Sequence, residues 1–147
     1  MSPTISFIVP GEPVAFARAG SNGKRRYTPA RQARYAEQVR EAAERAMGGM
    51  PPLEGAVTLD VRAVYAVPKS WKPARKASAH YKTSAPDVDN IVKLPKDAMT
   101  GVVYRDDAQV ALVIGDKIYG PYPSLTVVVY AAEPATHEVI QRAGLAP

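Results

Sequence analysis

The sequence of 147 residues has no cysteine, which excludes disulfide bonds and zinc sites built from thiolates. It also has no run of 18 apolar residues, so no segment is long enough to predict a transmembrane helix. The N-terminal residues lack the basic and apolar regions of a secretory signal, and no stretch repeats with a period of 20 to 50 residues. We therefore expect a cytoplasmic protein without a membrane partner and without a repeat architecture.

Acidic residues are scarce in the first part of the chain. Residues 1–86 contain 14 Lys and Arg against 6 Asp and Glu, whereas residues 87–147 contain 5 against 8. A basic region beside an acidic site suits a polyanionic partner that is held at its phosphates next to a metal ion. The alternative, ordinary solvated surface charge, stays open on composition alone. The length and the apolar fraction of 46% are typical of one globular domain, which we expect to span residues 1–147.

The pattern of apolar residues predicts a single α/β (α+β) domain, with a mixed β-sheet packed against helices. The clearest helix follows Thr28 and Pro29, a favourable cap and first residue, and ends at about Met47 before two glycines. Its expected buried stripe consists of Ala36, Val39, Ala43, Ala46 and Met47. Predicted strands cover residues 5–9, 57–67, 109–114 and 125–131, and a short helix covers about 90–99.

Two basic segments without clear periodicity predict loops that suit a polyanionic partner. One covers residues 17–27, and the other covers residues 66–84, which hold five basic residues and no acid. The basic residues of these segments and of the predicted helix start are candidates to hold the phosphates of such a partner: Arg18, Lys24, Arg25, Arg26, Arg31, Lys69, Lys72, Arg75, Lys76 and Lys82. The tail of residues 132–147 is expected to be weakly ordered, with one helical turn after Glu133.

The stretch from residue 87 to residue 107 is the most informative, because it holds five aspartates and only three basic residues. Carboxylates that a fold brings together repel one another, and a divalent metal is the natural counter-charge. Asp87 and Asp89 are two residues apart, so in an extended segment both side chains face one ion. A helix followed by a returning strand could bring Asp106 and Asp107 back beside them. Such an oxygen site suits Mg²⁺, with Mn²⁺ as a substitute.

Lys93 lies four residues after Asp89, one turn along the same face of the predicted helix. There it can stabilise charge on a phosphoryl group or position the attacking water. Each feature also has a simpler explanation. Asp89 can cap the helix, Lys93 can pair with Asp97, and the adjacent pair Asp106 and Asp107 can form a polar turn.

Two sets of motifs in this chain match a known pattern. The first is Pro86-Asp87-Val88-Asp89-Asn90-Ile91-Val92-Lys93, followed by Asp97-Ala98-Met99, Gly101-Val102-Val103 and Asp106-Asp107-Ala108-Gln109-Val110. The second is Val9-Pro10-Gly11-Glu12-Pro13-Val14 and Tyr27-Thr28-Pro29. Together they closely resemble the RusA family of Holliday junction resolvases. The resemblance implies a homodimeric, Mg²⁺-dependent crossover junction endodeoxyribonuclease, common in phages and prophages, that needs no organic cofactor.

The family makes paired symmetric nicks in four-way DNA junctions during recombination and repair. The resemblance therefore implies that the basic segments 18–34 and 69–82 grip the DNA arms through phosphates, which makes the basic residues named above DNA-binding candidates. It also implies that Trp71, Tyr81 or Phe16 can stack at the crossover, with plain packing as the alternative for each. Carried onto this sequence, the resemblance makes Asp87, Asp89 and Asp107 the catalytic acids and metal ligands, with Lys93 as the essential lysine and Asp106 as a further candidate ligand. Pro95 departs from the family pattern, because a proline inside a helix removes a backbone hydrogen bond and can displace its neighbours. The sequence therefore leaves two alternatives open: a branched-DNA-binding protein with impaired cleavage, and a nuclease that prefers other branched or single-stranded DNA.

Overall fold

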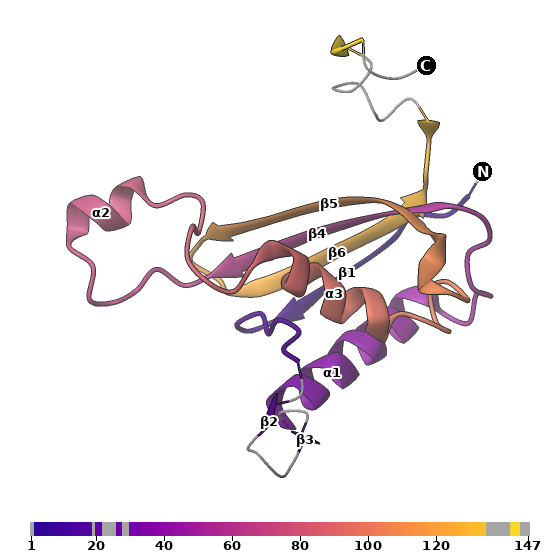
Figure 1. The fold of residues 1–147 in the computed structure, drawn as a ribbon, viewed down its shortest axis with the longest axis horizontal. Coiled ribbons are helices and arrows are strands. Elements are labelled where there is room, and N and C mark those ends of the chain that lie inside the picture. Colours follow the sequence, from indigo (N-terminus) through magenta and orange to yellow (C-terminus); the bar gives the residue numbers. More distant parts are fainter. Residues whose placement is uncertain (1, 19, 22–25, 28–29, 135–141, 145–147) are drawn as a thin grey trace.

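A four-stranded mixed sheet, covered on one face by two helices, forms the body of the protein (Figure 1). The computed structural model describes residues 2–18, 20–21, 26–27, 30–134 and 142–144. The strands lie in the order β1 (Ile5–Pro10), β6 (Ser124–Ala131), β4 (Val57–Tyr65) and β5 (Val110–Tyr119). The covering helices are α1 (Ala30–Met47) and α3 (Val88–Ala98). The expected α+β domain with a mixed sheet is thus confirmed.

The sheet combines antiparallel and parallel pairing. Strand β6 pairs antiparallel with both β1 and β4, whereas β4 and β5 run parallel. Parallel neighbours need a crossover connection, and here α3 lies within it between β4 and β5. This topology leaves β5 at one edge of the sheet, with α3 packed beside it.

The core lies between the sheet and the two helices. Every second residue of β4 points into it, and Leu59, Val61 and Ala63 are fully buried. On α1, the buried residues are Tyr35, Val39, Ala42, Ala43 and Met47, so the predicted stripe is correct for three positions, while Ala36 and Ala46 are half-buried. Each large side chain buried in this way stabilises the fold by about 1.5–3 kcal/mol.

Several elements differ from the sequence-based expectation. The basic segment 66–84 contains a short helix, α2 (Pro73–Ser78), that buries none of its residues and stands away from the sheet (Figure 1). Strand β5 extends five residues further than predicted, and α3 begins two residues earlier. The expected basic loop also holds a pair of two-residue strands, β2 (Gly20–Ser21) and β3 (Arg26–Tyr27).

Two further expectations fall largely outside the described residues. These are the cap at Thr28 and Pro29 and most of the tail after Glu133. Within the described part of the chain, no helix combines the length and the apolar character that crossing a membrane requires.

Candidate active site and nucleic-acid surface

The start of α3 positions the first two aspartates of the motif. Asp87 is the N-cap residue in extended conformation, and Asp89 lies in the first helical turn. The preceding turn is held by Lys117 of β5, whose Nζ donates to the backbone oxygens of Ser84 (2.8 Å) and Pro86 (2.7 Å). The expectation that both aspartates share an extended segment is therefore wrong. Because Asp89 is already helical, residues two apart do not face each other there.

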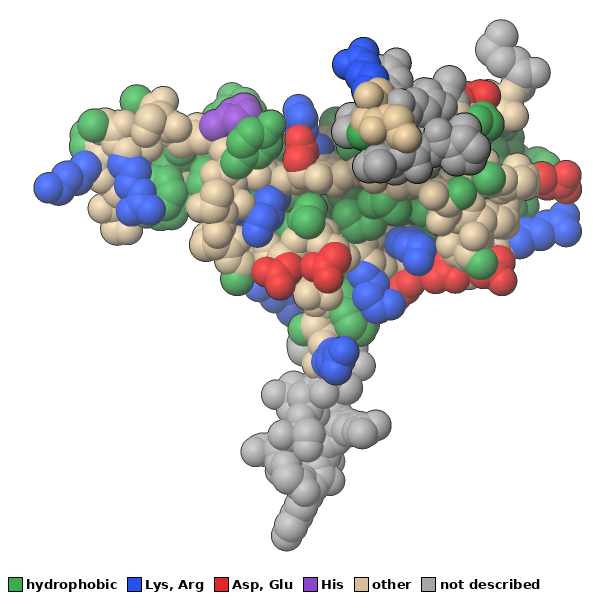
Figure 2. All heavy atoms as spheres, turned by 45° about the horizontal axis from the view of Figure 1, so that its top comes forward, with side chains coloured by type: hydrophobic (Ala, Val, Ile, Leu, Met, Phe, Trp, Pro, Cys, Tyr) green, Lys and Arg blue, Asp and Glu red, His purple; other side chains and the backbone are tan. Residues whose placement is uncertain are grey.

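A groove of about 550 Å³ runs between α3 and the edge strand β5. Its floor is apolar and includes Val92, Val113 and Gly115. Asp89, Lys93 and Lys96 line its helical wall, because positions i, i+4 and i+7 share one face of a helix. Figure 2 shows acidic and basic side chains beside exposed apolar surface on this side of the molecule. Such a groove offers one carboxylate and two ammonium groups to a phosphate-bearing ligand.

Gly115 explains how closely α3 approaches the sheet. A Cβ atom added at this glycine would lie 3.0 Å from a methyl group of Val92 and 3.4 Å from one of Val88. A strand glycine often marks such a close approach. The groove thus owes its shape to a residue without a side chain.

Lys93 lies in the groove but is already engaged. Its Nζ is 3.0 Å from Asp97 Oδ2 and 4.8 Å from the ring centroid of Phe16. The simpler explanation from the sequence, an ion pair with Asp97, is therefore present in the structure. About half of the Lys93 side chain is exposed, so a ligand in the groove can still reach it.

Pro95 does not interrupt α3. The helix continues to Ala98, and the backbone N–H of Met99 donates to the oxygen of Pro95 at 3.0 Å. Pro95 itself is buried, so its ring packs into the core while only its own N–H bond is missing. Lys93 therefore keeps its helical position one turn after Asp89.

The second pair of aspartates lies at the far end of α3. Asp106 caps a short 3₁₀ helix, η1 (Asp107–Gln109), by accepting from the N–H of Ala108 at 2.8 Å. Asp107 Oδ2 is 3.7 Å from Lys96 Nζ. Asp107 thus carries a carboxylate turned toward the groove wall, whereas the carboxylate of Asp106 serves the local backbone.

Gln109 fixes this segment to the body of the protein. Its Oε1 accepts from the backbone N–H groups of Arg105 (2.9 Å) and Asp106 (3.1 Å), and its Nε2 donates to the oxygens of Leu53 and Gly55, both at 2.9 Å. All four bonds need an amide side chain, with its acceptor and donor on one group. The glutamine of the motif therefore positions the aspartates.

The structure does not bring the two pairs of aspartates together within one chain. Asp107 lies beside Lys96, which is seven residues and about 10 Å of helix from Asp89. The two pairs lie apart because of the direction in which β5 runs along α3. The end of β5, at Lys117, lies beside the start of α3, whereas Asp107 precedes the beginning of β5. Among the described residues, no three His, Cys, Asp or Glu side chains are grouped to hold a metal ion. A single chain therefore does not fit the expected Mg²⁺ site.

Lys96 is a groove residue that the sequence reasoning missed. Its position seven residues after Asp89 was the available signal. The backbone oxygen of Lys96 accepts from the hydroxyl of the fully buried Tyr104 at 2.5 Å. Burial raises the pKa of Tyr104 strongly, and the nearby carboxylates of Asp107 and Asp97 raise it further. The phenol therefore stays protonated and donates to the helix that carries the groove.

The predicted DNA-binding residues lie on two parts of the surface. Lys69, Lys72, Arg75 and Lys76 are exposed on the arm formed by residues 66–84, where Figure 2 shows basic side chains gathered. Lys82 lies at the base of the arm and donates to Ser84 Oγ at 2.7 Å. Arg18 and Arg31 are exposed near the start of α1. Lys24, Arg25 and the side chain of Arg26 lie outside the described residues.

Aromatic rings support the arm. The guanidinium of Arg75 lies 3.7 Å from the ring centroid of Trp71, and Trp71 packs edge-on against Tyr119 at 5.1 Å. Tyr81 is 61% exposed and packs edge-on against His80. Packing therefore accounts for Trp71, while Tyr81 remains accessible.

Comparisons with known proteins agree with the motif. The family model described as endodeoxyribonuclease RusA matches residues 10–130, which is most of the chain. A Bacillus subtilis (strain 168) protein, named uncharacterized protein YqaN, is 33% identical over 134 residues, covering 85% of this chain and 94% of that protein.

Proposed function

The chain belongs to the RusA family of endodeoxyribonucleases, and on that premise we propose that it resolves four-way DNA junctions by paired symmetric nicks with Mg²⁺ as its cofactor. The observation that carries the proposal is the groove between α3 and β5. It presents Asp89, Lys93 and Lys96 on one helical face, directly after the turn that holds Asp87. These are the residue types that bind and hydrolyse a phosphodiester.

We assign the acidic roles to Asp87, Asp89 and Asp107. Asp106 is the weaker candidate, because its carboxylate already accepts the N–H of Ala108 and closes a capping box. Lys93 is the lysine that contacts the phosphate. One chain alone does not complete this set, so the proposal needs a second copy.

The free edge of β5 supports a homodimer. Among the described residues, the outer edge of β5 is paired only near its end, where Lys117 O accepts from Lys82 N (2.9 Å) and Tyr119 N donates to His80 O (2.8 Å). Backbone N–H and C=O groups alternate in direction along a strand, so those of residues 113 and 115 point outward from the sheet edge, as those of residues 117 and 119 do. The stretch 111–115 has no charged residue, and natural edge strands without charges tend to pair with another strand. We propose that a second copy pairs its β5 here, antiparallel, about a two-fold axis.

Antiparallel pairing would give each site a third carboxylate. The beginning of the partner's β5, with Asp107 of the partner subunit, would lie toward the end of β5 in the first chain. That end is where Lys117 holds the start of α3. Asp87 and Asp89 would then face a carboxylate from the other copy, and the two sites would be related by the two-fold axis that two nicks in opposing strands require.

The basic arm would hold the DNA outside the groove. Lys69, Lys72, Arg75 and Lys76 are exposed, and the sequence between residues 66 and 84 contains no acidic residue. Phosphate contacts of this kind release counterions, so we expect junction affinity to fall steeply with salt concentration.

The decisive experiment is cleavage of a synthetic four-way junction in Mg²⁺. We expect paired nicks from the wild type, and binding without cleavage from Asp89→Asn and Asp107→Asn. Asp116→Asn is the matched control, because Asp116 pairs with Arg62 on the other face of the sheet and should leave cutting intact. Cleavage by either site variant would contradict its assignment. Tight binding without cleavage in any divalent cation would favour the alternative of a branched-DNA-binding protein with impaired cleavage. A preference for flaps would favour the alternative of a nuclease that prefers other branched or single-stranded DNA.

A further inference from the structure

Lys96 lies in the groove between α3 and β5, but the function proposed above gives it no role of its own. It lines the helical wall of the groove together with Asp89 and Lys93. Because Lys93 and Lys96 are three residues apart, they share one face of α3 and are separated by about 4.5 Å along the helix axis. The groove therefore presents two ammonium groups in a row.

The ammonium group of Lys96 has unused hydrogen-bond donors. Its charged partner is Asp107, whose Oδ2 atom lies 3.7 Å away, beyond hydrogen-bond distance. A lysine carries three donors, and among the described residues no oxygen accepts a hydrogen bond from this one. The side chain is 32% exposed, so a ligand in the groove can reach it. Because an exposed ion pair contributes little, a phosphate oxygen can take the place of Asp107.

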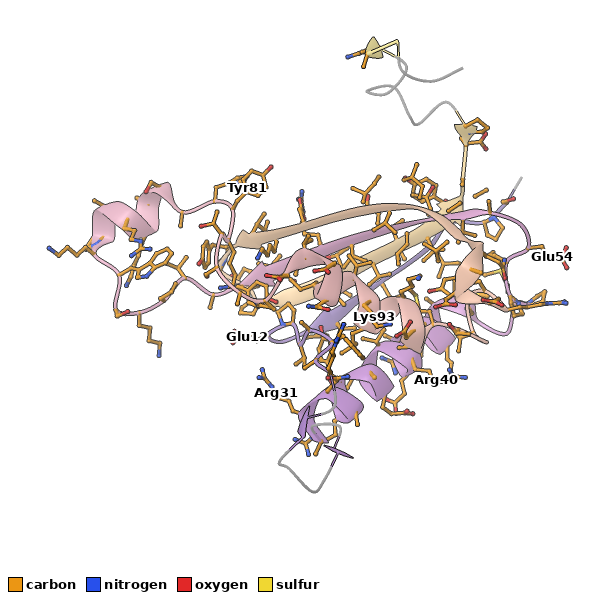
Figure 3. The ribbon with its side chains drawn as sticks, in the orientation of Figure 1. Glu12, Arg31, Arg40, Glu54, Tyr81 and Lys93 are labelled. Carbon is orange, nitrogen blue, oxygen red and sulfur yellow. The ribbon has the colours of Figure 1, made fainter. Side chains whose placement is uncertain are left out.

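The backbone that carries Lys96 is held firmly by its neighbours. The oxygen of Lys96 accepts from the hydroxyl of the buried Tyr104 at 2.5 Å. Just after the end of α3, the oxygen of Thr100 accepts from Arg40 of α1 at 3.1 Å. Figure 3 shows Arg40 and Lys93 on these two neighbouring helices. A charged group on such a fixed segment loses little conformational freedom when it binds a ligand.

We propose that Lys96 binds a second phosphate of the cleaved strand, next to the phosphate that Lys93 contacts. The inference rests on the proposed function and adds a contact within the same groove. Successive phosphates of one DNA strand lie about 3.4 Å apart along the duplex axis, a spacing that two lysines about 4.5 Å apart along a helix can follow. Lys96 thereby sets the register of the strand along α3, so that the phosphate to be cut lies at Lys93.

The test combines Lys96→Met with a set of four-way junctions. In each junction, one phosphate near the crossover is replaced by an uncharged methylphosphonate. Affinities are measured without divalent cations, so the strands stay intact. We expect Lys96→Met to weaken binding of the unmodified junction by about tenfold, the effect of one charge-assisted hydrogen bond. At one methylphosphonate position the substitution should have no further effect, because the contact is already lost there.

The salt dependence of binding is a second readout, which a structural role would not change. Loss of one phosphate contact should reduce the slope of log affinity against log salt concentration by about 0.9. Lys96→Arg keeps the charge and should retain most of the affinity and the full slope. Arg45→Met is the matched control, because Arg45 is an exposed cation of α1 that lines a different pocket, and it should bind like the wild type. The melting temperature of Lys96→Met should stay within about 4 °C of the wild type.

Several outcomes would overturn this role of Lys96. One is wild-type affinity and salt dependence in Lys96→Met, and another is an effect that adds at every methylphosphonate position. If Lys96 served only to orient Asp107, Lys96→Met would slow cleavage and leave binding unchanged, which would also overturn it.

Failure of the proposed function would look different. A wild type that binds junctions but cuts none in any divalent cation would overturn the proposed cleavage, while the methylphosphonate series would still decide whether Lys96 holds a phosphate. A wild type that binds no junction would overturn both proposals.

Discussion

Lys93 has two protein neighbours that compete with a phosphate for its charge. The ion pair with Asp97 is exposed and spans i,i+4, an arrangement worth only about 0.2–0.5 kcal/mol. The ring of Phe16 adds a weak attraction. Neither contact is strong enough to hold the ammonium group away from a phosphate in the groove. The pairing that the structure contains is therefore compatible with a role in cleavage.

Because the ion pair is weak, we expect substitutions of Lys93 and of Asp97 to have different effects on cleavage. Lys93→Met should lower the rate of junction cleavage by roughly 100-fold or more while binding persists, as expected for a group that stabilises charge in the transition state. Asp97→Asn should leave the cleavage rate within about threefold of the wild type, because it removes only the exposed pair. Rates are measured under single-turnover conditions. If the pair were purely structural, both variants would cut normally and lose the same small amount of stability.

The buried phenol of Tyr65 makes stability depend on alkaline pH. Burial raises its pKa to about 12, whereas the unfolded chain titrates near 10.0. The stabilisation is complete below pH 10 and is lost as pH rises toward 12, because the unfolded form ionises first. At pH 11 the loss is about 1 kcal/mol. The melting temperature of Tyr65→Phe should therefore fall less than that of the wild type between pH 9 and pH 11. Tyr122→Phe should follow the wild type, and an equal decline in all three would contradict this origin.

At the scale of elements, Gln109 joins the turn after α3 to the segment before β4. Gln109→Glu keeps the shape but replaces the donor that faces two carbonyl oxygens at 2.9 Å with a charged acceptor. We expect a loss of roughly 2 kcal/mol in the free energy of unfolding, measured in urea. Gln38→Glu, at an exposed position of α1, is the control and should change stability by less than about 0.5 kcal/mol. An unchanged stability in Gln109→Glu would show that the turn does not depend on these bonds.

The elements that were predictable are those whose local pattern agrees with their packing. Helix α1 and strand β4 bury the residues that their periodicity selects, so Val39 and Leu59 were readable from the sequence. Helix α2 buries nothing, and it therefore leaves no periodic signal. The second half of β5 was missed because Gly115 and Asp116 are typical of turns. Tertiary contacts explain why both residues lie in a strand. Gly115 leaves room for α3 to pack closely against β5, and Asp116 forms an ion pair with Arg62 of the neighbouring strand at 2.7 Å.

The sequence named candidate residues for the site, but it could not give their geometry. The motif identified the family, and the spacing placed Lys93 one turn after Asp89. Distances between Asp107 and the first pair depend on the direction in which β5 returns along α3, and residue spacing carries no information on direction. Two adjacent aspartates also look equivalent in the sequence, although in the structure Asp106 caps η1 and Asp107 faces Lys96.

At the scale of the whole molecule, the edge strand and the divided carboxylates are two aspects of one arrangement. A chain with a complete site would need no partner for chemistry, and an unpaired uncharged edge would only invite aggregation. In the proposed homodimer, pairing of two β5 edges would cover this edge and bring opposite ends of α3 and β5 from the two copies together. The proposed homodimer would therefore complete the site and would also match the symmetry of a four-way junction.

Mixing two inactive variants tests this arrangement directly. If Asp89 of one copy works with Asp107 of the partner subunit, a heterodimer of Asp89→Asn and Asp107→Asn contains one doubly altered site and one fully intact site. Mixed and re-equilibrated variants should therefore regain nicking, up to about half of the molecules at equal amounts by random pairing, each cutting one strand of a junction. Each variant alone should stay inactive. If all the carboxylates of a site came from one copy, every site in the mixture would lack one of them, and no nicking would return. A mixture of Asp89→Asn with Asp87→Asn supplies the control, because both substitutions fall on the same side of the proposed site and cannot complement.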